Sequence, residues 1–172
     1  TQKDLCLAHP KGGIMNIDVL SFGRLAYRVF EEVGQDARVV LDDEGKNLVL
    51  RKIAGECEKD LKVFKGNLKK QGYISEVKSV LSEFAQYGVD FERLDDFMKE
   101  VPPESYLHYK LDDIRTIYEK FEEYLSEKYI TKEEMLDVLS DAVPYSDILK
   151  GSVVAMDGFT GFTPVQNRLI GE

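Results

Sequence analysis

An acidic residue that follows an apolar run is the first candidate for chemistry in this sequence. Residues 152–156 read Ser-Val-Val-Ala-Met, a run that predicts a buried strand, and Asp157 comes directly after it. In α/β proteins a carboxylate at the carboxyl end of a parallel strand faces the crevice where nucleotides bind. Asp157 is therefore a candidate contact for a nucleotide-bound metal ion. The alternative is a glycine-rich turn that binds nothing.

Each end of the chain carries the pattern of a strand followed by a helix. After Asp157, Thr163 is placed to cap a helix whose first residue is Pro164. Near the other end, the apolar run at 14–20 predicts a strand, and Ser21 is placed to cap the helix that follows it.

The stretch from 36 to 150 has the apolar spacing of helix after helix and no convincing strand. A stripe through Ile74 predicts one helix that ends at Gly88. The longest predicted helix follows Pro103. Its apolar seam alternates spacings of four and three and consists of Leu107, Leu111, Ile114, Tyr118, Phe121 and Leu125. The seam favours packing inside one helical bundle over a coiled coil between chains.

Acidic neighbours in the same stretch do not form a predicted site. Thr131 and Glu134 have the spacing of a capping box, which is a structural signal. Glu122-Glu123 and Glu133-Glu134 are adjacent in sequence, and adjacent helix positions diverge by about 100°. We therefore expect these glutamates to form a solvated face.

Composition restricts the classes of function. With 23 Lys and Arg against 32 Asp and Glu, the formal net charge is −9, so the separate chain should bind DNA weakly. One basic face, or a partner subunit, can still supply a nucleic-acid contact. Without a membrane-spanning apolar stretch or a signal-peptide core, the sequence predicts a cytoplasmic parent protein. Cys6 and Cys57 lack ligand spacing, so neither a metal site nor a disulfide framework is expected.

The order of these motifs resembles that of superfamily 1 helicases of the UvrD/RecB type. Those helicases carry, as motif II, a strand followed by D-E-x-Q-D-x-x-P-x-Q. The segment MDGFTGFTPVQ aligns with it without a gap and matches at Asp157, Phe159, Pro164 and Gln166. Residues 17–22 occupy the place of the helicases' upstream strand that ends in T-x-H-S. More narrowly, VLSFGRLAYRVFEEVG and DGFTGFTP look like the AddB/RexB family of bacterial AddAB (RexAB) helicase-nucleases.

This resemblance implies a mainly α fold in three parts. Residues 35–150 would form an all-α insertion of the helicase 1B type, a helical bundle. Residues 1–34 and 151–172 would be small α/β remnants of a P-loop helicase domain, the first belonging to domain 1A and the second carrying a degenerate motif II. Because the chain begins at Thr1 without Met, we expect it to be an excerpt of a longer subunit. Unpaired strand edges predict that it self-associates.

The departures from active motors imply that this piece is noncatalytic. In an active motor the aspartate holds a metal ion, and the glutamate after it deprotonates the attacking water. Gly158 stands in place of that glutamate and Gly161 in place of the next acidic residue. Loss of a positioned base removes about 100- to 10,000-fold of rate. The G-x-x-x-x-G-K-[ST] phosphate loop is also absent from the sequence, so we expect no ATP, no metal and no activity here.

For the whole protein, the resemblance implies a heterodimer with the AddA/RexA motor. That complex would resect DNA ends in double-strand break repair and recombination, and AddB would contribute to strand binding and Chi recognition. ATP, Mg and an iron-sulfur cluster would belong to parts of the complex outside this chain.

The resemblance also implies a place for DNA contact. The corresponding strand-to-helix junction of these helicases faces the single strand, which makes Ser21, Phe22, Arg24 and Arg28 the candidate residues. Arg24 and Arg28 lie four apart on one helix face and could approach the same phosphates, or could instead pair with Glu31-Glu32. A function of another class stays open, a free-standing helical interaction scaffold whose motif matches are accidental.

Overall fold

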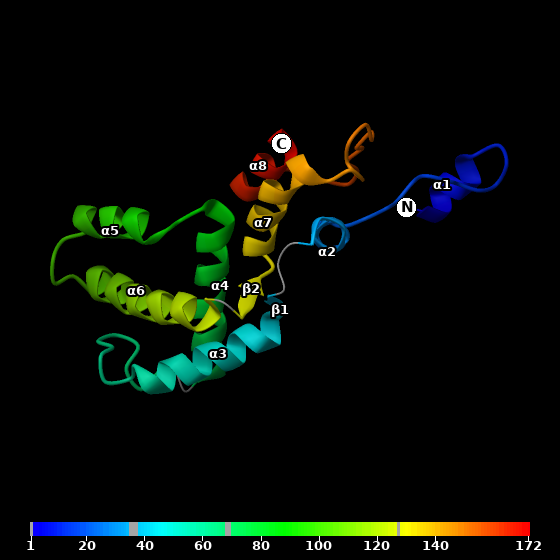
Figure 1. Cartoon of the computed structure of the whole chain (residues 1–172). Coiled ribbons are helices and arrows are strands. Elements are labelled where there is room, and N and C mark those ends of the chain that lie inside the picture. The colour runs from blue at the N-terminus through cyan, green and yellow to red at the C-terminus, as the bar shows by residue number, and fades with distance from the viewer. Residues whose placement is uncertain (1, 35–37, 68–69, 127) are drawn as a thin grey trace.

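The molecule is built mainly from helices, with one small sheet near its centre (Figure 1). The structure is a computed structural model and describes residues 2–34, 38–67, 70–126 and 128–172. Its elements are α1 (Gln2–Ala8), α2 (Phe22–Val33), β1 (Val39–Leu41), α3 (Asp43–Glu56), α4 (Gln71–Tyr87), α5 (Phe91–Glu100), α6 (Tyr106–Leu125), β2 (Tyr129–Thr131), α7 (Glu134–Ala142), a 3-10 helix (Val143–Tyr145) and α8 (Pro164–Gly171). The mainly α fold expected from the sequence is confirmed.

The small sheet lies where the sequence predicted only helices. Strands β1 and β2 are parallel, with Val39 opposite Tyr129 and Leu41 opposite Thr131. The expectation of no strand between 36 and 150 is therefore wrong. Each strand has three residues, which is too short to show an alternating pattern, and the pairing joins segments far apart in sequence.

The two strands expected at the ends of the chain are wrong in this structure. Residues 14–20 and 152–156 belong to no strand, although both segments are apolar. Their side chains are open to solvent, as Met15 at 87% and Val153 at 96% exposure illustrate. A strand needs a neighbour for its N–H and C=O groups, and no other part of the described chain pairs with either segment. Self-association of the chain stays a prediction.

Two hydrophobic cores lie on opposite sides of the β1–β2 sheet. The first core is formed by α3, α4 and α6 and includes Leu41 of β1. The second core is formed by α2, α7 and α8 and includes Ile130 of β2. Successive residues of a strand point to opposite faces, which lets three-residue strands serve both cores. The division of the chain at 34 and 150 stays a prediction, and here the two terminal helices α2 and α8 belong to the same core as α7.

The helix ends follow the capping chemistry expected from the sequence. The Ser21 hydroxyl accepts a hydrogen bond from the backbone N–H of Arg24, and Gly34 ends α2 at a left-handed φ of 71°. Gly88 ends α4 in the same conformation, and the side chains of Thr163 and Gln166 form the capping box of α8. These expectations are confirmed.

The seam of the longest helix is confirmed only in part. Ile114, Phe121 and Leu125 are buried in the first core, but Leu107 is 51% exposed near the start of α6. Ile117, which lies outside the predicted seam, is 1% exposed. The helix therefore buries a wider face than a two-position seam, as expected for a bundle rather than a coiled coil.

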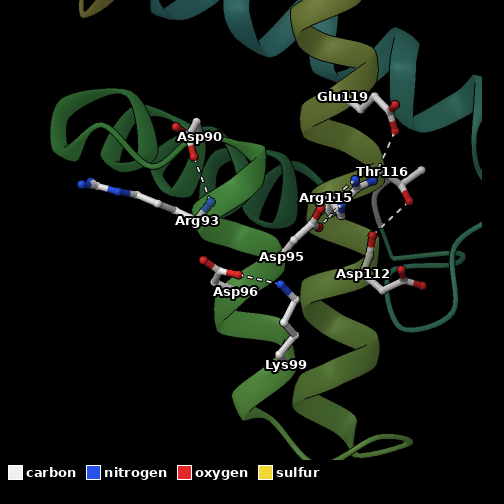
Figure 2. Close-up of polar contacts among 9 residues, drawn as sticks. All are labelled: Asp90, Arg93, Asp95, Asp96, Lys99, Asp112, Arg115, Thr116 and Glu119. Carbon is white, nitrogen blue, oxygen red and sulfur yellow. Dashed lines mark hydrogen bonds and ion pairs between the residues drawn. The ribbon is translucent and has the colours of Figure 1, made fainter.

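Charged side chains fasten α5 onto α6 (Figure 2). Arg115 of α6 donates two hydrogen bonds to the Asp95 carboxylate of α5 and also lies 3.5 Å from Glu119. These bonds hold the pKa of Asp95 below its usual value. The N-terminus of α5 is capped by Asp90, which accepts a hydrogen bond from the Arg93 backbone. Helix α5 is thus attached largely through polar contacts.

A buried carboxylate holds the loop between α3 and α4. Asp113 of α6 is 1% exposed and accepts hydrogen bonds from the backbone N–H groups of Lys62, Val63 and Phe64, at 2.8, 2.7 and 2.8 Å. One charged acceptor therefore satisfies three backbone donors that the loop would otherwise leave unpaired.

A second buried polar cluster lies where the two cores meet. Lys46 of α3 is 2% exposed, and its Nζ bonds Glu133 at 2.7 Å and Ser82 at 3.3 Å. Beside it, burial and the charge of Glu134 raise the pKa of Glu122 to about 7. Glu134 in turn accepts hydrogen bonds from the backbone and hydroxyl of Thr131.

The expectation that these glutamates form a solvated face is therefore wrong for three of them. Glu122, Glu133 and Glu134 are half-buried, and only Glu123 is exposed. Spacing along α6 could not show this, because the partners come from α3 and from the turn before α7.

Replacing Asp113 with Ala should destabilise the fold by about 3 kcal/mol, because three backbone N–H groups lose their acceptor. Urea unfolding followed by circular dichroism measures the change. Asp112→Ala is the matched control, since Asp112 makes a half-exposed ion pair with Lys62, and it should cost less than about 1 kcal/mol. Equal losses in the two variants would contradict the role assigned to Asp113.

Replacing Glu122 with Gln should remove a pH dependence of stability. With a folded pKa of about 7 and an ordinary value of 4.5, folded Glu122 holds a proton that the unfolded chain releases between these values. The free energy of unfolding therefore falls as pH rises through this range. Relative to the wild type, Glu122→Gln should gain roughly 2 kcal/mol on going from about pH 5 to about pH 8.

Glu123→Gln is the control for this measurement, because Glu123 is the exposed neighbour of Glu122 on the same helix. Its unfolding free energy should follow the wild type at both pH values. A Glu122→Gln variant that also follows the wild type would remove the assignment.

Candidate nucleic-acid interface

Three phenylalanines bring the two ends of the chain together. The ring centroid of Phe22, the first residue of α2, lies 5.5 Å from that of Phe159, and Phe159 lies 5.0 Å from Phe162. These distances are typical of favourable aromatic pairs. Phe159 remains 48% exposed, so one ring of the cluster stays accessible to solvent. The junction at 21–22 thus contacts the segment that follows Asp157.

Arg24 and Arg28 differ in their surroundings. Both are exposed on α2, but Arg28 lies 2.6 Å from Asp18 in an exposed ion pair. Arg24 makes no side-chain hydrogen bond or ion pair with any residue that the structure describes. Glu32 does not pair with either arginine, since its carboxylate accepts hydrogen bonds from the Ser146 hydroxyl and the Ile148 backbone. Of the two, Arg24 is the cation free to meet a phosphate.

Asp157 and the two glycines lie in an exposed turn. Within the described chain the Asp157 carboxylate has no hydrogen-bond or ion-pair partner, and its side chain is open to solvent. Gly158 has a φ of 79°, a conformation that side chains other than glycine rarely adopt. Gly161 has no such requirement, and a Cβ at either position would meet open space. The backbone at 158 is therefore better suited to glycine than to the glutamate of an active motor.

Gln166 is occupied by a structural task. Its side-chain oxygen accepts a hydrogen bond from the Thr163 backbone at 3.0 Å, while its own N–H donates to the Thr163 hydroxyl at 3.3 Å. This residue matches the helicase motif, yet here it closes the capping box of α8. Ser21 has the equivalent task at α2.

Two features of this region were not predicted from the sequence, the place of Phe162 and the contact between Glu32 and Ser146. Ser146 is fully buried, and the bond from its hydroxyl to Glu32, at 2.6 Å, ties α2 to the turn after α7. The signal available for Phe162 was its place three residues after Phe159. No sequence signal pairs Glu32 with a serine so distant along the chain.

Metal-ligand geometry is not found in the described residues, where no group of three or more His, Cys, Asp or Glu side chains is placed to hold an ion. Cys57 is buried in the first core, and burial raises the pKa of its thiol. In the same described ranges no helix has the length and apolar character needed to span a bilayer.

The sequence matches the family described as "ADDB, N-terminal" over residues 1–172. It is 48% identical over 170 residues to the B-type component of the ATP-dependent helicase/deoxyribonuclease of Lachnoclostridium phytofermentans, covering 99% of this chain and 15% of that protein. It is 36% identical to the protein of the same name from Alkaliphilus metalliredigens, with 98% and 15% covered. The relative from Thermoanaerobacter sp. (strain X514) is 38% identical, with 91% and 14% covered.

The chain thus spans about 15% of the length of its two relatives from Lachnoclostridium and Alkaliphilus. The matched segment nonetheless includes both terminal motifs and all the helices between them. The chain therefore belongs to the AddB N-terminal family.

Proposed function

We propose that this chain is a noncatalytic part of a helicase-nuclease subunit that binds DNA during double-strand break repair and recombination. The observation that carries the proposal is the contact between Phe22 and Phe159. It places the α2 junction and the turn after Asp157 at one exposed edge, next to the free guanidinium of Arg24. An exposed ring and a nearby unpaired cation are the two elements that single-strand binding sites combine.

The names of the relatives support the same proposal. They are B-type components of an ATP-dependent helicase/deoxyribonuclease, and we infer a similar assembly for this chain, with the AddA/RexA motor as partner and DNA as substrate. Chi recognition by the whole protein and a cytoplasmic location are part of the proposal. ATP, Mg and an iron-sulfur cluster are proposed for regions of the complex outside these residues.

The noncatalytic role follows from the turn at 157–161. Gly158 and Gly161 offer no carboxylate to activate a water molecule, and Asp157 has no polar partner in the described chain to hold it toward a metal ion. The described residues therefore lack the base that hydrolysis of a nucleoside triphosphate needs. We propose that this edge contacts DNA and leaves hydrolysis to the partner.

Membership in the AddB family disfavours the alternative of a free-standing interaction scaffold. That alternative required both terminal motif matches to be accidental. The contact between those motifs through Phe22 and Phe159 gives them a shared place in the fold as well.

In the intact complex, Arg24→Gln should weaken DNA binding and lower the slope of log affinity against log salt by about 1, as expected when one phosphate contact is lost. Fluorescence anisotropy with a labelled single strand across a salt series measures both quantities. Arg51→Gln is the matched control, because Arg51 is an exposed arginine on α3 without a side-chain partner in the described chain. Identical salt curves for the Arg24 and Arg51 variants would remove Arg24 from the interface.

Asp157→Asn should leave the ATP hydrolysis rate of the intact complex within about twofold of the wild type. The reason is that no base follows this carboxylate, so this protein does not contribute a catalytic step. Steady-state phosphate release in the presence of DNA measures the rate. A fall of about 100-fold would show that Asp157 serves an active nucleotide site.

A further inference from the structure

The loop between α3 and α4 concentrates positive charge on an acidic chain. Residues 57–70 contain five of the 23 basic residues, the lysines at 59, 62, 65, 69 and 70, but only two of the 32 acidic residues. The loop therefore has a net charge of +3, whereas the rest of the chain carries −12 within a total of −9.

This loop is anchored rather than free. Leu61 and Phe64 are 3% and 5% exposed and belong to the first core. Asp113 holds the backbone of residues 62–64 through three hydrogen bonds. With its apolar side chains buried, the loop presents its lysines to solvent: Lys59, Lys62, Lys65 and Lys70 are all exposed.

Three of these lysines are available to a ligand. Lys62 is already engaged, since its Nζ pairs with Asp112 at 2.9 Å and lies 4.9 Å from the centre of the Tyr109 ring. Lys59 and Lys65 make no side-chain hydrogen bond or ion pair within the described ranges. Lys70 makes one exposed contact of 3.4 Å with Asn67. Binding at Lys59, Lys65 and Lys70 would thus break no strong interaction of the fold.

We propose that the α3–α4 loop binds the phosphate backbone of duplex DNA. The inference rests on the proposed function of the chain as part of a DNA-processing protein. Exposed ammonium groups release counterions when they neutralise phosphates and need no particular base sequence. Duplex fits better than single strand because Phe64 is buried and the Tyr109 ring is covered by Lys62, so neither ring is free to stack on a base.

The loop is a second contact, separate from the edge formed by Phe22 and Phe159. In Figure 1 it lies at the end of α3 that is far from α2, beyond the body of the helical bundle. A DNA molecule that reaches both places would cross the face formed by α3, α4 and α6. The loop therefore positions duplex, while the aromatic edge is suited to a separated strand.

The test compares two triple variants of the intact protein in its complex. Lys59→Gln, Lys65→Gln and Lys70→Gln together remove three charges from the loop. Lys128→Gln, Lys132→Gln and Lys150→Gln remove three exposed charges elsewhere and form the matched control. Binding of a fluorescein-labelled blunt duplex is measured by anisotropy across a salt series, and assembly with the partner is checked by analytical ultracentrifugation.

The loop variant should lower the salt slope by about 3 and weaken duplex binding by at least about tenfold at about 0.1 M salt, whereas the control variant should follow the wild type. If the loop variant also follows the wild type, this inference is overturned and the proposed function stands. A loss of assembly with unchanged duplex binding would overturn it in favour of a protein contact. A loss confined to single strands would overturn the duplex assignment. A wild-type complex that binds no DNA would overturn the proposed function together with this inference.

Discussion

The parallel pairing of β1 with β2 is the constraint on which the rest of the fold depends. Three residues at 39–41 bind three residues at 129–131, and the helices α3 to α6 form the connection between them. Leu41 enters one core and Ile130 enters the other, so a very short sheet separates two helical layers while belonging to both. Without this pairing, α7 would have no fixed position relative to α3, and α2 and α8 would lose the helix on which they pack.

Charged groups buried beside the sheet make the same joint specific. Lys46 is taken out of water and is compensated by Glu133 and Ser82, which belong to two other parts of the chain. A buried ion pair contributes little net stability when its desolvation is counted, but removal of one partner leaves an uncompensated charge. The pair of Glu122 and Glu134 adds a group that titrates near neutral pH at this position. The arrangement therefore favours one relative placement of the two layers over others.

The exposed apolar segments are informative in the light of family membership. Residues 14–20 and 152–156 have strand composition, are exposed, and lie on either side of the Phe22 and Phe159 contact. The relatives from Lachnoclostridium and Alkaliphilus are several times longer than this chain. Apolar side chains exposed in this way mark surfaces suited to cover by further protein. The aromatic edge is therefore best understood as part of a larger assembly, in agreement with a protein that contributes binding rather than chemistry.

Local chemistry was readable from the sequence because it depends on residues close together in the chain. The caps at Ser21 and Thr163, the helix ends at Gly34 and Gly88, and the substitution of Gly158 for a catalytic acid are all local features. The family resemblance depended on the same kind of short motif. The failures were equally systematic: strand composition at 14–20 and 152–156 did not produce strands, because a strand also requires a partner.

Only the tertiary structure decided the contacts between distant segments. The β1–β2 sheet, the burial of Glu122 beside Glu134, and the three hydrogen bonds to Asp113 all join residues that no periodicity connects. The candidate interface shows both sides of this division. The types of Phe22, Arg24 and Phe159 were visible in the sequence, but the contact that brings the two phenylalanines together and the freedom of Arg24 depend on the packing of α2 against α7 and its surroundings. Residue types and short spacings determine local conformation, whereas burial and long-range partners are properties of the folded chain as a whole.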